Sequence, residues 1–142
     1  MTHPLSDPPV YVWDPFVRVF HWSLVACVLL NFVVEEGETL HQAIGYAASA
    51  LVVLRVLWGF IGTRHARFAH FFPTPERVRR HVSGLLAGTA PHYVGHNPLG
   101  ALMMLSLMAL VLALGLTGYL QTTDSFWGEE WLEELHEGLA FT

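Results

Sequence analysis

The sequence predicts an all-α integral membrane protein, a bundle of helices that run up and down across the bilayer. The composition is 53% hydrophobic and only 13% charged, and the mean hydropathy of +0.42 exceeds that of a typical soluble domain. Three apolar runs have about 20 residues each, or about 30 Å of helix, which is the thickness of a bilayer core. These predicted spans cover residues 16–34, 40–60 and 99–120.

A fourth segment starts at about residue 131 and reads WLEELHEGLAFT before the sequence stops at Thr142. Its roughly 12 residues give about 18 Å of helix, which does not cross a bilayer. Tryptophan and acidic residues followed by small and apolar ones are typical of the point where a helix enters the membrane. We therefore expect a single membrane domain over residues 1–142 with an incomplete fourth helix, as in a fragment of a longer four-helix protein. An interfacial helix is the alternative.

The positive charges, all of them arginine, are distributed unevenly between the connections of the predicted spans. The connections at 35–39 and 121–130 hold none. Because cytoplasmic loops of membrane proteins are enriched in arginine and lysine, we expect the N-terminus and the 61–98 connection in the cytoplasm. Five arginines lie in this connection: Arg64, Arg67, Arg77, Arg79 and Arg80.

Acidic side chains gather on the other side of the predicted membrane, where nine of the twelve are found. A negative face favours a basic soluble partner, although solvated loop charges would give the same pattern. Membrane lipid is an expected partner and nucleic acid is not. The nine acids are Glu35, Glu36, Glu38, Asp124, Glu129, Glu130, Glu133, Glu134 and Glu137.

The 61–98 connection contains the segment FFPTPERVRRHVSGLL, which predicts a short basic helix. Thr74 is suited to cap this helix, Pro75 fits its first turn and Glu76 follows. A basic amphipathic helix of this kind is expected to lie along the anionic inner leaflet.

Three of the nine histidines lie where an ionisable side chain is costly. His21 is about one turn inside the first span, on its cytoplasmic side. His41 and His136 open the second span and the fourth segment, so both are expected at the outer membrane level. Ionisable residues within spans usually face the bundle interior or a functional pathway.

Two histidines from different helices at one depth are what a bis-imidazole b-type haem requires, because the imidazoles must reach the iron from opposite faces. His41 and His136 satisfy this condition. Alternatively, each forms a hydrogen bond across a helix interface. Gly45, on the same helical face as His41, leaves room either for a flat macrocycle or for a neighbouring helix. The single cysteine, Cys27, excludes a C-x-x-C-H motif for covalent haem.

Arg55 follows His41 by 14 residues, which places it about 40° from the same helical face and about 21 Å deeper. An arginine facing the bundle interior at this depth could pair with a haem propionate. Alternatively, Arg55 snorkels to the cytoplasmic surface with no partner.

Six motifs resemble, in order, those of bacterial di-haem b-type cytochromes, the family that holds cytochrome b561 and the cytochrome b subunits of nickel-iron hydrogenases. The motifs are VYVWDPFVRVFHW, HQAIGY, LRVLWGFIGTRHARFAHF, GHNPLGALMML, LTGY and ELHEGLA. The resemblance covers nearly the whole chain. It implies a four-helix protein of the bacterial inner membrane with two haem b groups. Such a protein carries electrons between the quinone pool and a redox partner, for example a periplasmic c-type cytochrome, alone or in a larger membrane complex.

The resemblance also implies roles for individual residues. His21 corresponds to the first-helix ligand of an inner haem, whose second ligand lies in the family beyond the end of this chain. His41 corresponds to the second-helix ligand of an outer haem, and His136 to its fourth-helix partner. His96 is interpreted as a quinone contact, a helix-start hydrogen bond or a substitute ligand opposite His21. Four arginines are implied as contacts to haem propionates or lipid headgroups: Arg18, Arg55, Arg64 and Arg67.

Two other functions remain open at this point. His21, His41 and His136 could bind ions in sequence, as in a histidine-lined metal or proton conduit. The chain could also be a purely structural subunit that holds a larger redox complex together through its apolar faces. A conduit would require acids or a series of polar residues within the spans, and the spans have almost none. We expect an electron carrier rather than a stand-alone enzyme, with no catalytic residues.

Overall fold

A computed structural model of the protein describes residues 15–35, 38–89, 93 and 96–142. Within these residues the regular secondary structure is entirely helical, which confirms the predicted all-α class. The elements are α1 (Pro15–Asn31), α2 (Thr39–Ile61), η1 (Arg64–Ala66), α3 (Phe68–Phe71), α4 (Pro75–Leu86), α5 (Pro98–Gln121) and α6 (Glu130–Ala140).

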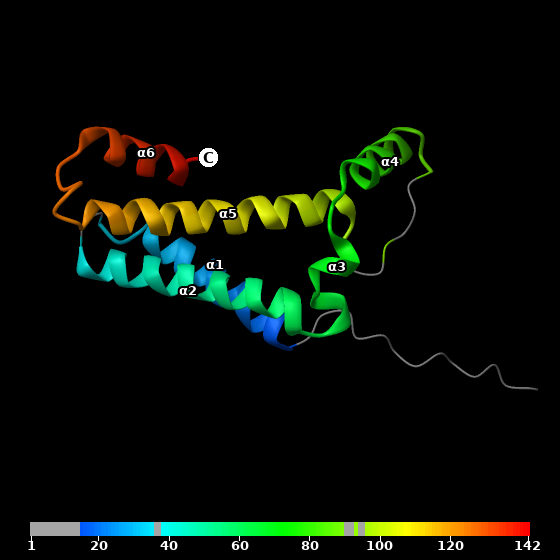
Figure 1. Cartoon of the computed structure of the whole chain (residues 1–142), viewed down its shortest axis with the longest axis horizontal. Helices are drawn as coiled ribbons and strands as arrows, with labels where there is room; N and C mark the ends of the chain where they lie inside the picture. Colours follow the sequence, from blue (N-terminus) through cyan, green and yellow to red (C-terminus); the bar gives the residue numbers. More distant parts are fainter. Residues whose placement is uncertain (1–14, 36–37, 90–92, 94–95) are drawn as a thin grey trace, which may run out of the picture.

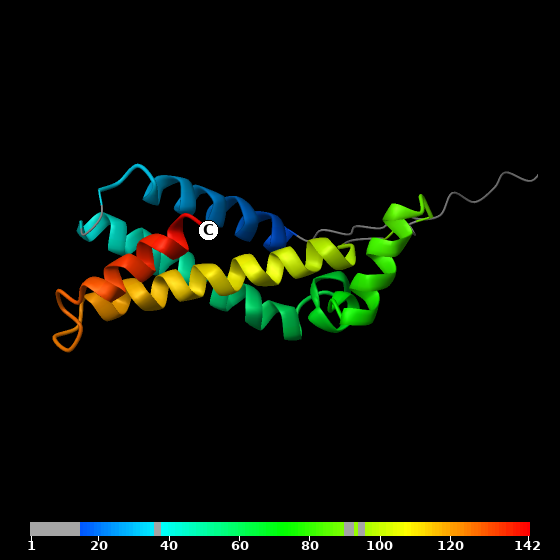
Figure 2. The same ribbon diagram turned by 90° about the horizontal axis from the view of Figure 1, so that it is seen from above.

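The four helices α1, α2, α5 and α6 run alternately up and down, each packed against its neighbour in the chain (Figure 1). The view from above shows α4 crossing the end of the bundle, away from α6 (Figure 2). We call the end formed by residues 32–35, 38 and 122–134 the acidic end, and the end formed by η1, α3 and α4 the arginine-rich end. Glu36, one of the nine acids, lies outside the described residues.

Two helices, α2 and α5, are long and apolar enough to cross a membrane, and only a minor part of each is buried by protein. A core helix of a soluble protein would be mostly buried, whereas these helices leave large apolar side chains such as Leu54, Leu107 and Leu116 exposed. This exposure suits helices surrounded by lipid.

Helix α1 is shorter than its predicted span of 16–34. It has 17 residues, or about 25 Å of helix. The helix ends at Asn31, and residues 32–34 form a turn in which Val33 N donates to the Leu30 carbonyl at 3.0 Å. Asparagine and two consecutive valines are weak helix formers, which explains the early end of an otherwise apolar segment.

The buried core lies along the line where α1, α2 and α5 meet. Phe20, Val52 and Met108, one from each helix, form its centre. Nearer the acidic end, α2 and α5 approach closely because Gly115 faces Ser49, and a Cβ at Gly115 would collide with the Ser49 hydroxyl. Small residues that allow close backbone approach are a common means of packing helices in membranes.

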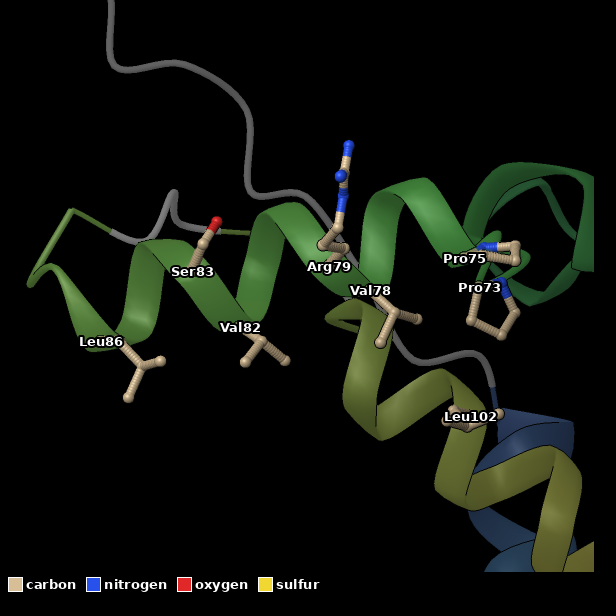
Figure 3. Close-up of a pocket in the computed structure, with 8 residues that line it drawn as sticks. All are labelled: Pro73, Pro75, Val78, Arg79, Val82, Ser83, Leu86 and Leu102. Carbon is tan, nitrogen blue, oxygen red and sulfur yellow. The ribbon is translucent and has the colours of Figure 1, made fainter.

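Helix α4 confirms the basic helix predicted from the sequence. It begins at Pro75, and Thr74 caps it by accepting a hydrogen bond from Arg77 N at 3.4 Å. Val78, Val82 and Leu86 point to the same side as Leu102 of α5, and Arg79 points away from them (Figure 3). These apolar side chains line an open groove of about 560 Å³ between α4 and α5.

The close approach at Gly115 leads to a test of the packing. Gly115→Leu should lower the free energy of unfolding by about 2 kcal/mol, because the added side chain has no room against α2. The matched control is Gly138→Leu in α6, where a Cβ meets open space and an effect within about 0.5 kcal/mol is expected. Thermal unfolding of the full chain in detergent, followed by circular dichroism, provides the measurement. Equal midpoints for the two variants would contradict the packing described here.

Candidate functional site

The structure brings His41 and His136 together at the acidic end of the bundle. His41 lies in the first turn of α2 and His136 in the middle of α6. Both side chains are half-buried. Their ring centres are 6.4 Å apart and the ring planes are inclined at 64°. Two helices that are not neighbours in the chain therefore present imidazoles to each other, as their common depth predicts.

His136 owes its position to the packing of α6 against α5. Leu132, one turn earlier, is 1% exposed and anchors α6, and its carbonyl accepts a hydrogen bond from Gln121 Nε2 at 3.3 Å. The Nδ1 atom of His136 lies 2.8 Å from Thr117 Oγ1. A Cβ at Gly118 would approach the His136 ring to 3.3 Å, so this glycine leaves room for the ring.

Sequence reasoning assigned no role to Thr117. The residue belongs to the LTGY motif, which served only to support the family resemblance. A signal was nevertheless present, because this threonine and the adjacent Gly118 are expected at the same depth as His136. Polar side chains within spans often form hydrogen bonds between helices.

The two imidazoles fit a metal ion with axial histidine ligands. A metal–nitrogen bond is about 2.0 Å long, so two imidazoles whose ring centres lie about 6 to 7 Å apart could hold a metal ion between them. The observed separation is 6.4 Å. In the described part of the chain, the buried Nδ1 of His41 has no hydrogen-bond partner. A buried imidazole nitrogen without a partner is costly unless a ligand completes the site.

The number of available ligands suits haem better than a free metal ion. Among the described residues, no group of three or more His, Cys, Asp or Glu side chains is placed to hold a metal ion. Two histidines are sufficient for haem iron, since the porphyrin supplies the remaining four ligands. The described residues thus give no support to a series of metal sites along the bundle.

Gly45 faces the end of α1 rather than the His41–His136 pair. A Cβ at Gly45 would lie 3.6 Å from Asn31 Nδ2. Of the two interpretations considered for this glycine, the structure therefore supports the close approach of helices.

Three predicted site residues are exposed and lie away from the histidine pair. His21 is exposed on α1, and its ring contacts that of Trp22 at 5.4 Å. Arg18 is exposed one turn earlier on the same helix, and Arg64 is exposed in η1. Their roles toward an inner haem or lipid headgroups stay predictions.

Two other predicted arginines stabilise the turn at the arginine-rich end. Arg55 is 1% exposed, its Nη2 donates to the Ala66 carbonyl at 3.3 Å, and its guanidinium lies 5.5 Å from the centre of the Phe68 ring. The prediction that Arg55 snorkels to the surface without a partner is therefore wrong. Arg67 donates from Nε to the Gly62 carbonyl at 2.7 Å, just after the end of α2.

His96 lies half-buried before α5, with its ring centre 5.1 Å from that of Phe71. Asn97 provides the hydrogen bond that starts α5, because its Oδ1 accepts from Gly100 N at 2.7 Å. Burial lowers the pKa of His96 below 6.5, and the nearby positive charge of Arg55 lowers it further. His96 is thus held as a neutral imidazole at the arginine-rich end.

An antiparallel bundle of apolar helices with two facing imidazoles near one end is the arrangement expected of a membrane cytochrome with non-covalent haem. The comparison with known proteins agrees, and the chain belongs to the prokaryotic cytochrome b561 family, which it matches over residues 12–142. The family resemblance inferred from the sequence motifs is confirmed.

Several curated relatives are named as hydrogenase subunits. The chain is 24% identical to the "Probable Ni/Fe-hydrogenase B-type cytochrome subunit" of Azotobacter vinelandii, in an alignment that covers 89% of this chain and 65% of that protein. The protein of the same name from Rhizobium leguminosarum bv. viciae is 26% identical, with 86% and 63% covered. The chain therefore spans less than two thirds of the length of these relatives. No solved structure matches the chain.

The lowered pKa of His96 predicts how this residue responds to pH. Diethyl pyrocarbonate reacts with neutral imidazole, so His96 should stay reactive at lower pH than free histidine added as a reference, when both are followed by mass spectrometry. Arg55→Gln should move the His96 profile toward higher pH, because it removes a positive charge that opposes protonation. Identical profiles for His96 and free histidine would contradict this assignment.

The same pKa difference has a consequence for stability. The folded-state pKa lies below the ordinary value of 6.5, so between these two values the unfolded chain binds more protons. Stability is therefore unaffected by this group above the ordinary pKa and falls as the pH drops through the folded value. His96→Gln should remove the contribution of this residue to the loss of folding stability at low pH.

Proposed function

We propose that the protein is a membrane cytochrome that carries single electrons through a non-covalent haem b held by His41 and His136. The single observation that carries the proposal is the separation of 6.4 Å between the two imidazole centres. Two histidines on different helices, in a chain of the cytochrome b561 family, favour this ligand set.

The residues of the chain prepare the site for one-electron chemistry, which haem supplies when bound. His41 and His136 would each provide a nitrogen ligand to its iron. The packing of α6 on α5 through Leu132 holds the second imidazole in place, and the apolar bundle limits the access of water. A fixed ligand geometry and a low local dielectric are the means by which a protein tunes such a centre.

We further propose that the acidic end faces the periplasm and that the N-terminus and the arginine-rich end face the cytoplasm of a bacterial inner membrane. The apolar side of α4, with Val78, Val82 and Leu86, would then face the bilayer at the level where α5 enters it (Figure 3). The arginines of α4 would meet the anionic headgroups of the inner leaflet.

The arginine-rich end also offers a site for a quinone. A cavity of about 250 Å³ is present there, next to the half-buried His96 and the Phe71 ring. A neutral imidazole and an aromatic ring suit a flat, uncharged carbonyl compound. The cavity is lined by His70, Phe71, Arg77, Arg80, Tyr93, His96 and Pro98.

His21, on the cytoplasmic half of α1, is the proposed ligand of a second, inner haem.

The acidic end is the proposed contact with a redox partner. The described acids at this end are exposed, and three of them, Glu130, Glu133 and Glu134, lie on α6 close to His136 in sequence. A hydrogenase is one such partner, because the curated relatives are named as hydrogenase subunits. A basic c-type cytochrome is another, since its charge would complement this surface.

The ligand assignment is tested by removing each imidazole. His41→Ala and His136→Ala should each abolish most of the low-spin signal of this haem in the visible spectrum, because its iron would lose one of its two strong ligands. The exposed His70→Ala at the opposite end is the matched control and should leave the spectrum unchanged. Added imidazole should restore part of the signal in the alanine variants. A low-spin spectrum unaffected in both variants would refute the assignment.

The docking surface is tested by its dependence on charge and salt. With a basic c-type cytochrome as the probe, Glu133→Gln combined with Glu134→Gln should slow electron transfer severalfold, and Glu76→Gln in α4 should not. Raising the salt should slow the wild type, because a Debye length of about 8 Å at physiological ionic strength screens exposed charges. A rate independent of both changes would show that the acids serve only solubility.

A further inference from the structure

The hydroxyl of Thr117 makes three short contacts but has only one hydrogen to donate. Its Oγ1 lies 2.9 Å from the Ala113 carbonyl and 3.1 Å from the Leu114 carbonyl of its own helix. It also lies 2.8 Å from Nδ1 of His136. Thr117 is 6% exposed, so water does not compete for these bonds.

The three contacts are compatible only if the hydroxyl hydrogen points to the backbone. A hydroxyl that donated to Nδ1 would leave its oxygen facing two carbonyl oxygens with no hydrogen between them, which is repulsive. When it donates to a carbonyl, its lone pairs are free to accept from a protonated Nδ1. The hydrogen bond therefore runs from His136 Nδ1–H to Thr117 Oγ1.

We propose that Thr117 is a positioning residue that holds His136 in its Nδ1–H tautomer, so that the lone pair of Nε2 is directed to the haem iron. The inference rests on the proposed function, since it presupposes that His136 is a ligand. In a neutral imidazole one nitrogen carries the hydrogen and only the other can bind a metal. By accepting a hydrogen bond from Nδ1, Thr117 keeps the hydrogen on that nitrogen and leaves Nε2 to bind the metal.

The hydrogen bond between the two side chains meets a requirement of His136 and not of Thr117. The threonine hydroxyl already has a backbone acceptor, as threonines within helices often do, so its own hydrogen-bonding requirement is met without the histidine. Gly118, the next residue, leaves room for the ring. Thr117 and Gly118 together thus supply an acceptor and a space at the same point of α5.

The same contact distinguishes the two proposed ligands. His41 Nδ1 is buried without a hydrogen-bond partner in the described part of the chain, whereas His136 Nδ1 is bonded. An acceptor on the far nitrogen of a ligating histidine fixes the ring and raises its basicity. His136 is therefore the proposed ligand whose ring is held by the protein, and Nδ1 of His41 is left available for the ligand that completes the site.

The direct test is the position of the hydrogen on the His136 ring. Protonated and unprotonated imidazole nitrogens have well-separated ¹⁵N chemical shifts. In the full chain prepared without haem, labelled with ¹⁵N-histidine, His136 should carry its hydrogen on Nδ1. Thr117→Val should shift the ring toward the other tautomer, and Thr117→Ser should restore the wild-type pattern. A wild-type His136 with its hydrogen on Nε2 would overturn the proposal, whatever the state of haem binding.

The haem-loaded protein provides the second test. Thr117→Val should weaken haem binding about tenfold and raise the reduction potential, because a less basic ligand stabilises ferric iron less. Thr117→Ser should behave as the wild type. The matched control is Thr123→Val, which also removes a hydroxyl bonded to a backbone carbonyl, that of Leu120 at 2.6 Å, but touches no histidine.

The two proposals fail in different ways. If the wild type showed no bis-imidazole haem, the proposed function would be refuted, and so would the role of His136 Nε2 as an iron ligand. If the wild type showed that haem and Thr117→Val left both affinity and potential unchanged, the role of Thr117 alone would be refuted. A loss of affinity equal in Thr117→Val and Thr123→Val would also refute it, because it would reflect only a general loss of stability on removal of a threonine hydroxyl.

Discussion

Water is absent from the core of a bilayer, so the polar side chains of this bundle depend on partners within the protein. Most of those described find one. Thr117 meets a backbone carbonyl and His136, Arg55 meets the Ala66 carbonyl, and Ser49 donates to the Gly45 carbonyl at 2.9 Å. The buried Nδ1 of His41 has no such partner among the described residues, as is also true of Oδ1 of Asn31 and Nδ1 of His81, but His41 in addition faces a second imidazole, that of His136. The requirement that polar groups be paired is what makes the His41–His136 pair a candidate ligand site rather than an incidental contact.

The two ends of the bundle use charge differently. At the arginine-rich end, Arg55 and Arg67 donate hydrogen bonds to backbone carbonyls in the segment that follows α2. Burial, and then the charge of Arg55, lower the pKa of His96. At the acidic end the described carboxylates are exposed, and the histidine pair is half-buried. One end is therefore built around fixed positive charge, and the other presents negative charge to its surroundings.

Much of the fold follows from the sequence, because hydropathy and turn chemistry are local properties. The helices α2 and α5 agree with the predicted spans within two residues at each end, and Thr74 caps α4 as predicted. The pairing of His41 with His136 was also predictable, since it depends only on depth along two helices. The early end of α1 at Asn31 was not, because an apolar run does not by itself show where a helix stops.

Other features depend on how the helices rotate against each other, which hydropathy does not determine. A rotation of α5 by a fraction of a turn would separate Thr117 from His136, and nothing in a span of apolar residues specifies that angle. The partner of Arg55 is a carbonyl 11 residues away, brought near only when the chain folds back through η1 and α3. In the same way, the rotation of α2 against α1 makes Gly45 face Asn31 instead of the histidine pair.

The most direct test of the account is the electron paramagnetic resonance spectrum of the oxidised full chain, expressed with haem available and purified in detergent. Two axial imidazoles impose a strong ligand field, so the account predicts a low-spin ferric signal from at least one haem b per chain. A purely high-spin signal, or a purified chain that binds no haem, would contradict it.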